Sequence, residues 1–469
     1  MTDFAHTPDP LGLDAAEMRR LGYWVVDRVV AHLQGIAERP AIQTGTPAEL
    51  RSALGGPPPQ SGTDDPVQAL ETLADVALTH MQHGEHPRNF ARVPAPSSYA
   101  GVLGEWLGTG FNAIAASWGG GSGPAAVELV TLDWLRTLLG MPEGTEGVMT
   151  SGGSLANLTA LAAARAEDGP GVCYLSDQTH ASIVRGFPAL GFAPDQVRII
   201  PSDDEMRLPV DQLSAAIVED KSAGRRPGFV VANAGTTNTG AVDPLPEIAD
   251  LCRSERLWLH VDGAYGASAA LCDAGRPMLR GIERADSLVL DPHKWLFQPI
   301  DIGCLLVSRP GALRRAFRMS PDYLADVTGV DDEVDFRDRS LELTRRARAL
   351  KLWLSFRIYG VERISAAIAH GIALAEHAER VVAADREWEV MTPAQLGIVT
   401  LARRGANDEA HAAKAADLAE SGFGLVTSTK VRDRPALRLC TINPRTSAQD
   451  VTSVLQRLGV RVGGEPPLA

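Results

Sequence analysis

The chain has 469 residues, with 45 Lys and Arg against 58 Asp and Glu, and a formal net charge of -13. This length allows one large core with a smaller domain beside it. The acidic balance and the lack of a basic stripe argue against nucleic acid as a partner. The apolar runs are of strand length, too short to cross a membrane.

The N-terminus and the cysteines favour a cytoplasmic protein. Residues 1–10 have neither a basic stretch nor a long apolar one, so no signal peptide is expected. The five cysteines are scattered without metal-ligand spacing. This pattern favours reduced thiols and no metal site.

The N-terminal segment, residues 1–83, is predicted to be helical. Asp14 to Glu17 has the pattern of a capping box, and apolar residues then recur every three or four positions. A Pro- and Gly-rich linker follows over 55–65, and a second helix is predicted over 66–81. The first helix has no apolar partner nearby in sequence, so it packs either on its own core or on another subunit.

The central part, residues 84–345, is predicted to be a large α/β domain. It begins with a loop over 84–99, a glycine-rich loop over 119–124 and a helix over Val127–Leu139. Short apolar runs follow at Gly147–Thr150, Val172–Leu175, Val197–Ile200, Phe229–Ala232, Trp258–Val261, Ser287–Leu290 and Cys304–Val307. Helices are predicted between them at 154–166, 181–190, 209–219, 244–256 and 276–284. This alternation is typical of a mostly parallel sheet covered on both faces.

A small C-terminal α+β domain is predicted over 346–469. Residues 310–340, which precede it, are irregular and rich in charge. The predicted elements are helices at Arg345–Tyr359, 361–384, 408–421 and 447–458, and strands at Val399–Ala402, Leu425–Thr427 and Leu437–Cys440.

Lys294 follows the buried run Ser287–Leu290 after only three residues. In open α/β sheets, ligands bind beyond the carboxyl ends of the strands. A lysine at that place is predicted to be partly desolvated, which would lower its pKa and make its amine a nucleophile of the kind that forms a Schiff base. A solvated loop lysine is the commoner alternative.

Two other strand ends carry groups that suit a cofactor. Asp262 ends the run that begins at Trp258, and a carboxylate there suits a positive partner such as a protonated pyridine nitrogen. Capping of the next helix is the alternative. The stretch from Thr150 to Asn157 follows a strand and opens a helix with two glycines and two serines. Its backbone N–H groups suit a phosphate, although such a stretch is often only a turn.

His180 and the loop from Asn233 to Gly240 also follow strands. The flat imidazole could lie on a cofactor ring, and a local cap or pair is the alternative. The small hydroxyl side chains of the loop could contact a cofactor closely, or form only a polar loop. Together the strand ends supply a phosphate cradle, a flat residue, a carboxylate and a lysine, a combination that is hard to produce by chance.

With these motifs the chain resembles the group II pyridoxal-phosphate decarboxylases, the aromatic-L-amino-acid decarboxylase family, over nearly its whole length. The most specific motifs are Asp291-Pro-His-Lys-Trp, His260-Val-Asp-Gly-Ala-Tyr, Ser176-Asp-Gln-Thr-His and Lys351-Leu-Trp-Leu-Ser-Phe-Arg-Ile-Tyr-Gly. The resemblance implies fold type I, as in aspartate aminotransferase, with a seven-stranded sheet domain and a small C-terminal domain. It also implies an N-terminal segment that packs across a homodimer whose active sites lie at the subunit interface.

The resemblance further implies a set of residues that hold pyridoxal 5'-phosphate. They are Gly153, Ser154, His180, Thr237, Asp262, Ala264, Asp291, His293 and Lys294. Lys294 would carry the cofactor as a Schiff base, and Asp262 would pair with the pyridine nitrogen. His180 and Ala264 would pack on opposite faces of the ring.

The phosphate and the ring edge have their own implied partners. Gly153 and Ser154 would bind the phosphate, helped by His293 or Asp291. Thr237 would lie near the ring or its hydroxyl group.

Tyr323 matches the tyrosine of the family's mobile loop, which returns a proton to the substrate carbon after CO2 has left. Relatives with phenylalanine at this position tend to follow an oxidative route to aldehydes. The charged, irregular surroundings of Tyr323 suit a loop that orders over a bound substrate, and an ordinary half-buried loop tyrosine is the alternative. The implied reaction is decarboxylation of an L-amino acid to its amine and CO2, with oxidative deamination as the alternative.

The side chain of the substrate is less well defined. The family's aromatic wall is matched here by Arg92, Val93, Ile114 and Ala116, and that wall is smaller than in animal relatives. The lost rings could make room for an indole, or Arg92 could point inward and pair with an acidic side chain. Arg92 could also face solvent or the other subunit. The expected substrate is an aromatic or bulky apolar L-amino acid, with an acidic one as the alternative.

Overall fold

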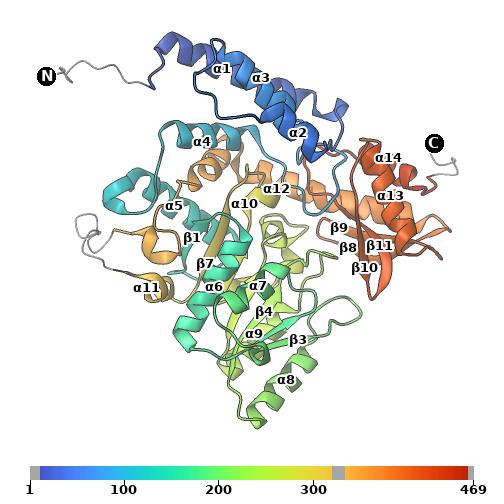
Figure 1. The fold of residues 1–469 in the computed structure, drawn as a ribbon. Helices are drawn as coiled ribbons and strands as arrows, with labels where there is room; N and C mark the ends of the chain where they lie inside the picture. Colours follow the sequence, from blue (N-terminus) through green and yellow to red (C-terminus); the bar gives the residue numbers. More distant parts are fainter. Residues whose placement is uncertain (1–10, 320–332, 463–469) are drawn as a thin grey trace.

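A seven-stranded sheet lies at the centre of the computed structural model, which describes residues 11–319 and 333–462 (Figure 1). Its strands are β1 Glu146–Thr150, β2 Val172–Ser176, β3 Val197–Ile200, β4 Pro227–Asn233, β5 Trp258–Asp262, β6 Ser287–Leu290 and β7 Gly303–Val307. Their order is β1-β7-β6-β5-β4-β2-β3, and β7 alone runs antiparallel to its neighbours. The predicted mostly parallel α/β sheet is therefore confirmed.

The strands match their predicted runs because most of them are apolar throughout. Every residue of β2, β5, β6 and β7 is buried, as expected for strands covered on both faces. Helix α6 (Gly153–Asp168) packs across the middle of the sheet. The other helices of this part are α5 Trp118–Leu138, α7 Ala181–Ala189, α8 Val210–Ser222, α9 Leu245–Glu255 and α11 Ala312–Phe317.

Four predicted segments of the N-terminal and central parts differ from the structure. Residues 310–340, predicted to be irregular, include the helix α11. The helix predicted over 276–284 is two 3-10 turns, because Gly281 adopts a φ of 94° between them. The glycine-rich loop predicted over 119–124 forms the first turns of α5, broken at Gly121. The helix predicted over 66–81 ends at Thr72 as α3 (Pro66–Thr72) and continues only as a wider π turn.

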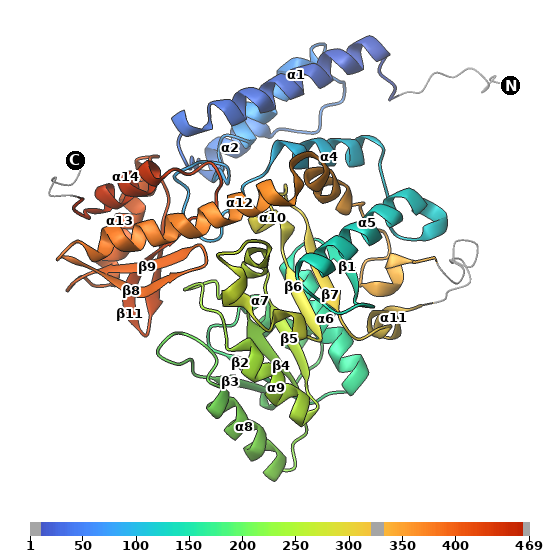
Figure 2. The same ribbon diagram turned by 180° about the vertical axis from the view of Figure 1, so that it is seen from behind.

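A smaller antiparallel sheet lies beside the central one (Figure 2). Its order is β10-β11-β9-β8, and its strands are β8 Trp388–Gln395, β9 Ile398–Arg403, β10 Thr427–Val431 and β11 Arg434–Cys440. Strand β8 was not predicted, and β10 begins where the predicted strand ends. Helices α13 (Asp408–Glu420) and α14 (Ala448–Leu458) complete this α+β part.

The long helix α12 (Ala349–Ala383) connects the two sheets. It contacts α5 and α4 (Tyr99–Gly110) near its start and β8, β9 and α14 further along. Gly360, with a φ of 71°, divides it in two at the position where the sequence predicts a break. The domain boundaries at residues 83 and 345 stay predictions.

The N-terminal helices lie on the outside of this body (Figures 1 and 2). They are α1 Ala15–Gln34, α2 Pro47–Leu54 and α3. Asp14 caps α1 by accepting from two backbone N–H groups, and no residue of α1 is buried. In the part of the chain that the structure describes, no helix is both long and apolar enough to cross a membrane.

A buried ion pair joins the start of the C-terminal part to the central sheet. The side chains of Glu128 and Arg345 are both fully buried, and Arg345 Nη2 lies 2.7 Å from Glu128 Oε1. The Met149 N–H donates to the same carboxylate, and Arg345 also donates to the carbonyls of Ala115 and Met149. One guanidinium therefore ties together α5, β1 and the approach to α12.

Glu128→Gln should lower the free energy of unfolding by about 3 kcal/mol, because it leaves the Arg345 guanidinium buried without a counter-charge. Urea denaturation followed by circular dichroism would measure this change. Glu17→Gln is the matched control, since Glu17 pairs with Arg20 on the surface of α1, and it should leave stability nearly unchanged. Equal effects of the two substitutions would contradict the structural role given to Glu128.

Candidate active site

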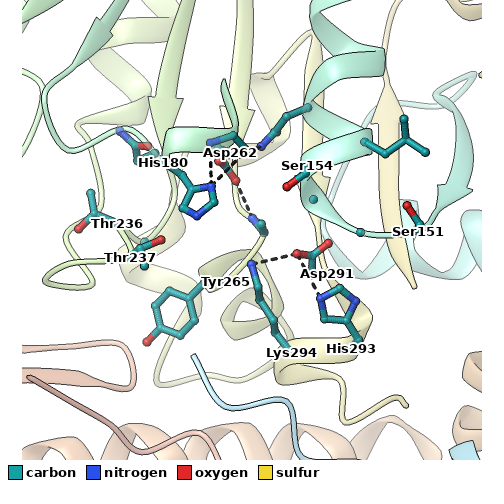
Figure 3. A pocket seen from close by; sticks show the side chains of 18 residues that line it. Ser151, Ser154, His180, Thr236, Thr237, Asp262, Tyr265, Asp291, His293 and Lys294 are labelled. Atoms are coloured by element: carbon teal, nitrogen blue, oxygen red, sulfur yellow. Dashed lines mark hydrogen bonds and ion pairs between the residues drawn. The ribbon is translucent and has the colours of Figure 1, made fainter. Parts of the chain in front are cut away.

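A cavity of about 370 Å³ opens beyond the carboxyl ends of five strands, β1, β2, β4, β5 and β6 (Figure 3). This is the edge at which ligands of parallel sheets bind. All nine residues predicted to hold the cofactor line this one cavity: Gly153, Ser154, His180, Thr237, Asp262, Ala264, Asp291, His293 and Lys294. The structure thus brings together residues that lie up to 141 positions apart, from Gly153 to Lys294.

Lys294 lies in the short helix α10 (Pro292–Trp295), which begins directly after β6. Its Nζ is 2.9 Å from Asp291 Oδ2. Burial by itself lowers the pKa of Lys294, but the attraction and hydrogen bond of Asp291 raise it by more, so the pKa lies above its usual value. The predicted lowered pKa is therefore wrong for the free protein, because the prediction did not place a carboxylate beside the amine.

Asp291 also faces His293 and the glycine-rich turn. Asp291 Oδ2 is 3.6 Å from His293 Nε2, and Figure 3 shows His293 and Lys294 both pointing toward this carboxylate. The buried Asp291 Oδ1 has no hydrogen-bond partner among the described atoms. A Cβ at Gly153 would lie 2.8 Å from Asp291 Oδ2 and 3.1 Å from the Cβ of Ala264, so only glycine fits there.

The amino end of α6 forms the other wall of the cavity. Gly152 precedes the helix with a φ of 156°, and no side chain caps the first turn. The first N–H groups of this 16-residue helix are thus left to a ligand or to water. Such an end attracts anions, since the helix dipole and the N–H groups act together.

Asp262 ends β5 at the base of the cavity and is only 7% exposed. Its Oδ1 accepts from the Ala264 N–H at 3.1 Å, and Asp262 does not cap the next helical turn, which begins at Gly266 without a side-chain cap. Its Oδ2 accepts from Asn157 Nδ2 at 3.1 Å. A buried carboxylate that accepts from two donors and forms no salt bridge with any described residue suits a positively charged ligand.

His180 makes the local capping contact that was the alternative from the sequence, and its place on a cofactor ring stays a prediction. Its Nδ1 accepts from the Ser182 N–H at 3.3 Å and lies 2.8 Å from Ser182 Oγ, so the side chain caps α7. The imidazole also lines the cavity and remains exposed. Thr237 is exposed at the same cavity, next to the buried Thr236.

The four predicted substrate contacts, Arg92, Val93, Ile114 and Ala116, do not line the cavity of the single chain. Arg92 is exposed, and its backbone is held by Thr427 Oγ1 and by the guanidinium of Arg438. Ile114 is 42% exposed. Contact of these residues with substrate stays a prediction. Tyr323 lies outside the described residues.

Nine further residues line the cavity and were not singled out from the sequence: Ser151, Gly152, Leu155, Asn157, Ser182, Asn233, Gly235, Thr236 and Tyr265. Tyr265 stacks on Trp295, with ring centroids 5.2 Å apart, and its Oη accepts from the Gly397 N–H. Asn157 and Tyr265 lie in stretches of sequence that were already discussed for neighbouring residues. That closeness in sequence could have indicated that they line the cavity.

These residues fit pyridoxal phosphate. The uncapped end of α6 suits its phosphate, Asp262 suits a protonated ring nitrogen, and Lys294 supplies an amine for its aldehyde. The unpaired Oδ1 of Asp291 and the lack of room for a side chain at Gly153 are consistent with a site built around a ligand.

Comparison with known proteins gives the same result. Residues 57–403 match the family model "Pyridoxal-dependent decarboxylase conserved domain". An aromatic-L-amino-acid decarboxylase from Bacillus atrophaeus is 43% identical over 461 residues, covering 96% of each chain. A phenylacetaldehyde synthase from Petunia hybrida is 35% identical, covering 82% of this chain and 80% of the relative. The crystal structure of an Oryza sativa TDC with PLP and tryptamine has a TM-score of 0.90 at 29% identity, covering 96% of this chain and 98% of the other.

Borohydride reduction of the protein with pyridoxal phosphate should fix one cofactor per chain on Lys294. Lys294→Ala should lose this covalent adduct, because no other lysine lines the cavity. Intact-protein mass spectrometry and peptide mapping would measure it. The control is Lys430→Ala, whose side chain is 57% exposed on β10, and it should keep the adduct. An adduct that persists in Lys294→Ala would contradict the assignment.

Proposed function

The chain belongs to the pyridoxal-dependent decarboxylase family, and on that premise we propose that it converts an aromatic L-amino acid to its amine and CO2. One observation carries the proposal: a single cavity holds the Lys294 amine, the buried Asp262 carboxylate and the uncapped end of α6. A cytoplasmic location is also proposed, supported by five cysteines that are all buried and unpaired.

Pyridoxal phosphate, when bound, supplies a ring that accepts the electron pair released as the carboxylate of the amino acid departs. Asp262 stabilises positive charge at the ring nitrogen, since both of its oxygens are fixed by hydrogen bonds and cannot turn away. The first turn of α6, after Gly152, would offer backbone N–H groups to the phosphate.

Lys294 holds and moves protons at its Nζ. Asp291 keeps that amine charged in the free protein, 2.9 Å away. Lys294 Nζ would have to give up a proton before it could attack an aldehyde, and Asp291 Oδ2, 2.9 Å away, would accept that proton. His180 covers one side of the cavity, where a flat ring can shield the reacting groups from water.

The preference for aromatic side chains rests on the relatives. The Bacillus atrophaeus relative is named for aromatic substrates, and the Oryza sativa structure contains tryptamine. Of the two interpretations of Arg92, inward pairing with an acidic side chain has less support, because Arg92 is exposed and does not line the cavity. We therefore favour an aromatic amino acid over an acidic one.

A panel of L-amino acids would test the substrate and the product together. Tryptophan, phenylalanine, tyrosine and dopa should yield amine and CO2 in equal amounts, measured by chromatography and CO2 release. Glutamate and aspartate should have a kcat/KM lower by on the order of 100-fold, because the predicted contacts with Val93, Ile114 and Ala116 would leave their side-chain carboxylates unpaired. Faster turnover of glutamate than of any aromatic substrate would reject the proposed specificity.

Aldehyde formation is the second candidate reaction, favoured by the Petunia hybrida relative, which is a phenylacetaldehyde synthase. It would yield aldehyde, ammonia and peroxide in place of the amine. The tyrosine at position 323 favours simple decarboxylation, as the family resemblance implies. Tyr323→Phe should therefore shift the product from amine toward aldehyde, and aldehyde as the main product of the unchanged protein would overturn our choice.

We also propose that the protein is a homodimer with its active sites at the subunit interface. The support is α1, a 20-residue helix with no buried residue, on which Met18 and Tyr23 are 55% and 66% exposed. A helix of this kind needs an apolar partner. Ile114, exposed and away from the cavity of its own chain, would reach the cavity of the partner subunit.

Met18→Glu combined with Tyr23→Glu should weaken the dimer by placing charges in an apolar contact. Analytical ultracentrifugation at micromolar concentration should show monomer in this variant and dimer in the parent protein. The control is Val218→Glu on α8, at a residue that is 57% exposed and far from α1 in the sequence. A parent protein that sediments as a monomer would refute the dimer.

A further inference from the structure

Asp262 is the end of a chain of four hydrogen bonds that runs behind the cavity. Trp258 Nε1 donates to Ser287 Oγ at 2.8 Å, and Ser287 Oγ is 2.8 Å from His260 Nδ1. His260 Nε2 is 3.0 Å from Asn157 Oδ1, and Asn157 Nδ2 donates to Asp262 Oδ2 at 3.1 Å. The four residues that precede Asp262 in this chain are at most 1% exposed.

The two ends of the chain fix its direction. The indole N–H of Trp258 can only donate, so Ser287 Oγ must accept from it and has its own proton to give to His260 Nδ1. At the other end, a carboxylate can only accept, so Asn157 must turn its amide nitrogen toward Asp262 and its oxygen toward His260. The Asp262 end therefore requires His260 to carry a proton on Nε2, and the Trp258 end leaves the Ser287 hydroxyl proton available for His260 Nδ1.

The opposite tautomer is unfavourable in this place. A proton on Nδ1 of His260 would leave Nε2 as an acceptor against Asn157 Oδ1, which is also an acceptor. Turning the amide of Asn157 would relieve that clash but would set its oxygen against Asp262. Either arrangement leaves a buried polar contact unmade, which is costly.

We propose that Trp258, Ser287, His260 and Asn157 form a one-directional relay of hydrogen bonds whose function is to hold Asp262 as an oriented carboxylate for the ring nitrogen of the cofactor. His260 is a positioning residue in this relay, in its neutral form with the proton on Nε2. The inference rests on the proposed role of Asp262. It explains why a histidine stands at position 260 of the motif, although His260 is buried and does not line the cavity.

The surroundings keep His260 neutral. Burial lowers its pKa to about 4, although the nearby Asp262 acts in the opposite direction. A neutral imidazole can accept from the Ser287 hydroxyl at Nδ1 and donate to Asn157 at Nε2, so all hydrogen bonds of the chain run in one direction. An imidazolium would carry a proton on both nitrogens, and its Nδ1 proton would face the proton of Ser287. The relay is thus a fixed set of dipoles that all point their positive ends toward Asp262.

Nuclear magnetic resonance of the cofactor-free protein tests the relay without any substitution. In protein labelled with 15N histidine, His260 should show a protonated Nε2 and an unprotonated Nδ1 at pH 7, with the signal assigned by its loss in His260→Gln. A proton on Nδ1, or on both nitrogens, would overturn the proposal. This result does not depend on whether the protein binds pyridoxal phosphate or decarboxylates anything.

A matched pair of serine variants tests what the relay does. Ser287→Ala removes the hydroxyl that links Trp258 to His260, whereas Ser268→Ala removes an equally buried hydroxyl with no hydrogen-bond partner among the described atoms. Ser287→Ala should weaken binding of pyridoxal phosphate about tenfold relative to Ser268→Ala, as expected for one lost hydrogen bond in a chain ending on a charge. It should also shift the absorption band of the bound cofactor.

The dissociation constant is measured by absorbance titration, and thermal melting of both cofactor-free variants checks that they fold. Equal affinities and equal spectra in the two variants would overturn the relay. If Ser287→Ala does not fold, the tautomer of His260 in the unchanged protein decides the proposal alone. Failure of the unchanged protein to bind pyridoxal phosphate would instead count against the proposed function and leave the tautomer result standing.

Discussion

The contact between Lys294 Nζ and Asp291 Oδ2 sets the charge of the active site. It joins the first and last residues of the turn that follows β6, so the amine is held by the same backbone that ends the strand. The amine stays charged although it lies in a largely buried place, because Asp291 offsets the cost of burial. The rest of the cavity is arranged around this pair: Gly153 packs against Asp291, Gly152 packs against His293, and Asp262 supplies a second carboxylate on the neighbouring strand.

Much of the fold could be predicted from the sequence, and the reasons are physical. Strands such as β6 are apolar throughout, and the residues that follow them are small or polar, so both the sheet and the edge that binds ligand are visible in the pattern. Strand β8 was missed because its side chains alternate poorly and its pairing with β9 shifts register. The segment at 276–284 has helical composition, but Gly281 packs against Pro246, a contact that no local pattern reveals.

The active-site residues could be predicted in part for the same physical reason. Residues at strand ends were found because the sheet itself brings them together, whereas the hydrogen bond of Asn157 to Asp262 joins side chains 105 positions apart, which no local pattern shows. The direction of the Lys294 pKa shift depends on a contact between side chains, which sequence does not show. The substrate wall was the hardest part, because Arg92 and Ile114 lie away from the cavity of their own chain.

The stack of Tyr265 on Trp295 has a mechanical consequence. Trp295 follows Lys294 directly, and its indole is packed against Gly371 of α12 and Gly397 between β8 and β9, each of which would bring a Cβ to 3.3 Å. The Gly397 N–H also donates to Tyr265 Oη. The small sheet thus packs against the indole of the residue that directly follows the active-site lysine. A chimera with the C-terminal part of a relative would keep the position of Trp295, and so of Lys294, only if that part has glycine at the positions of Gly371 and Gly397. Neither glycine lines the cavity.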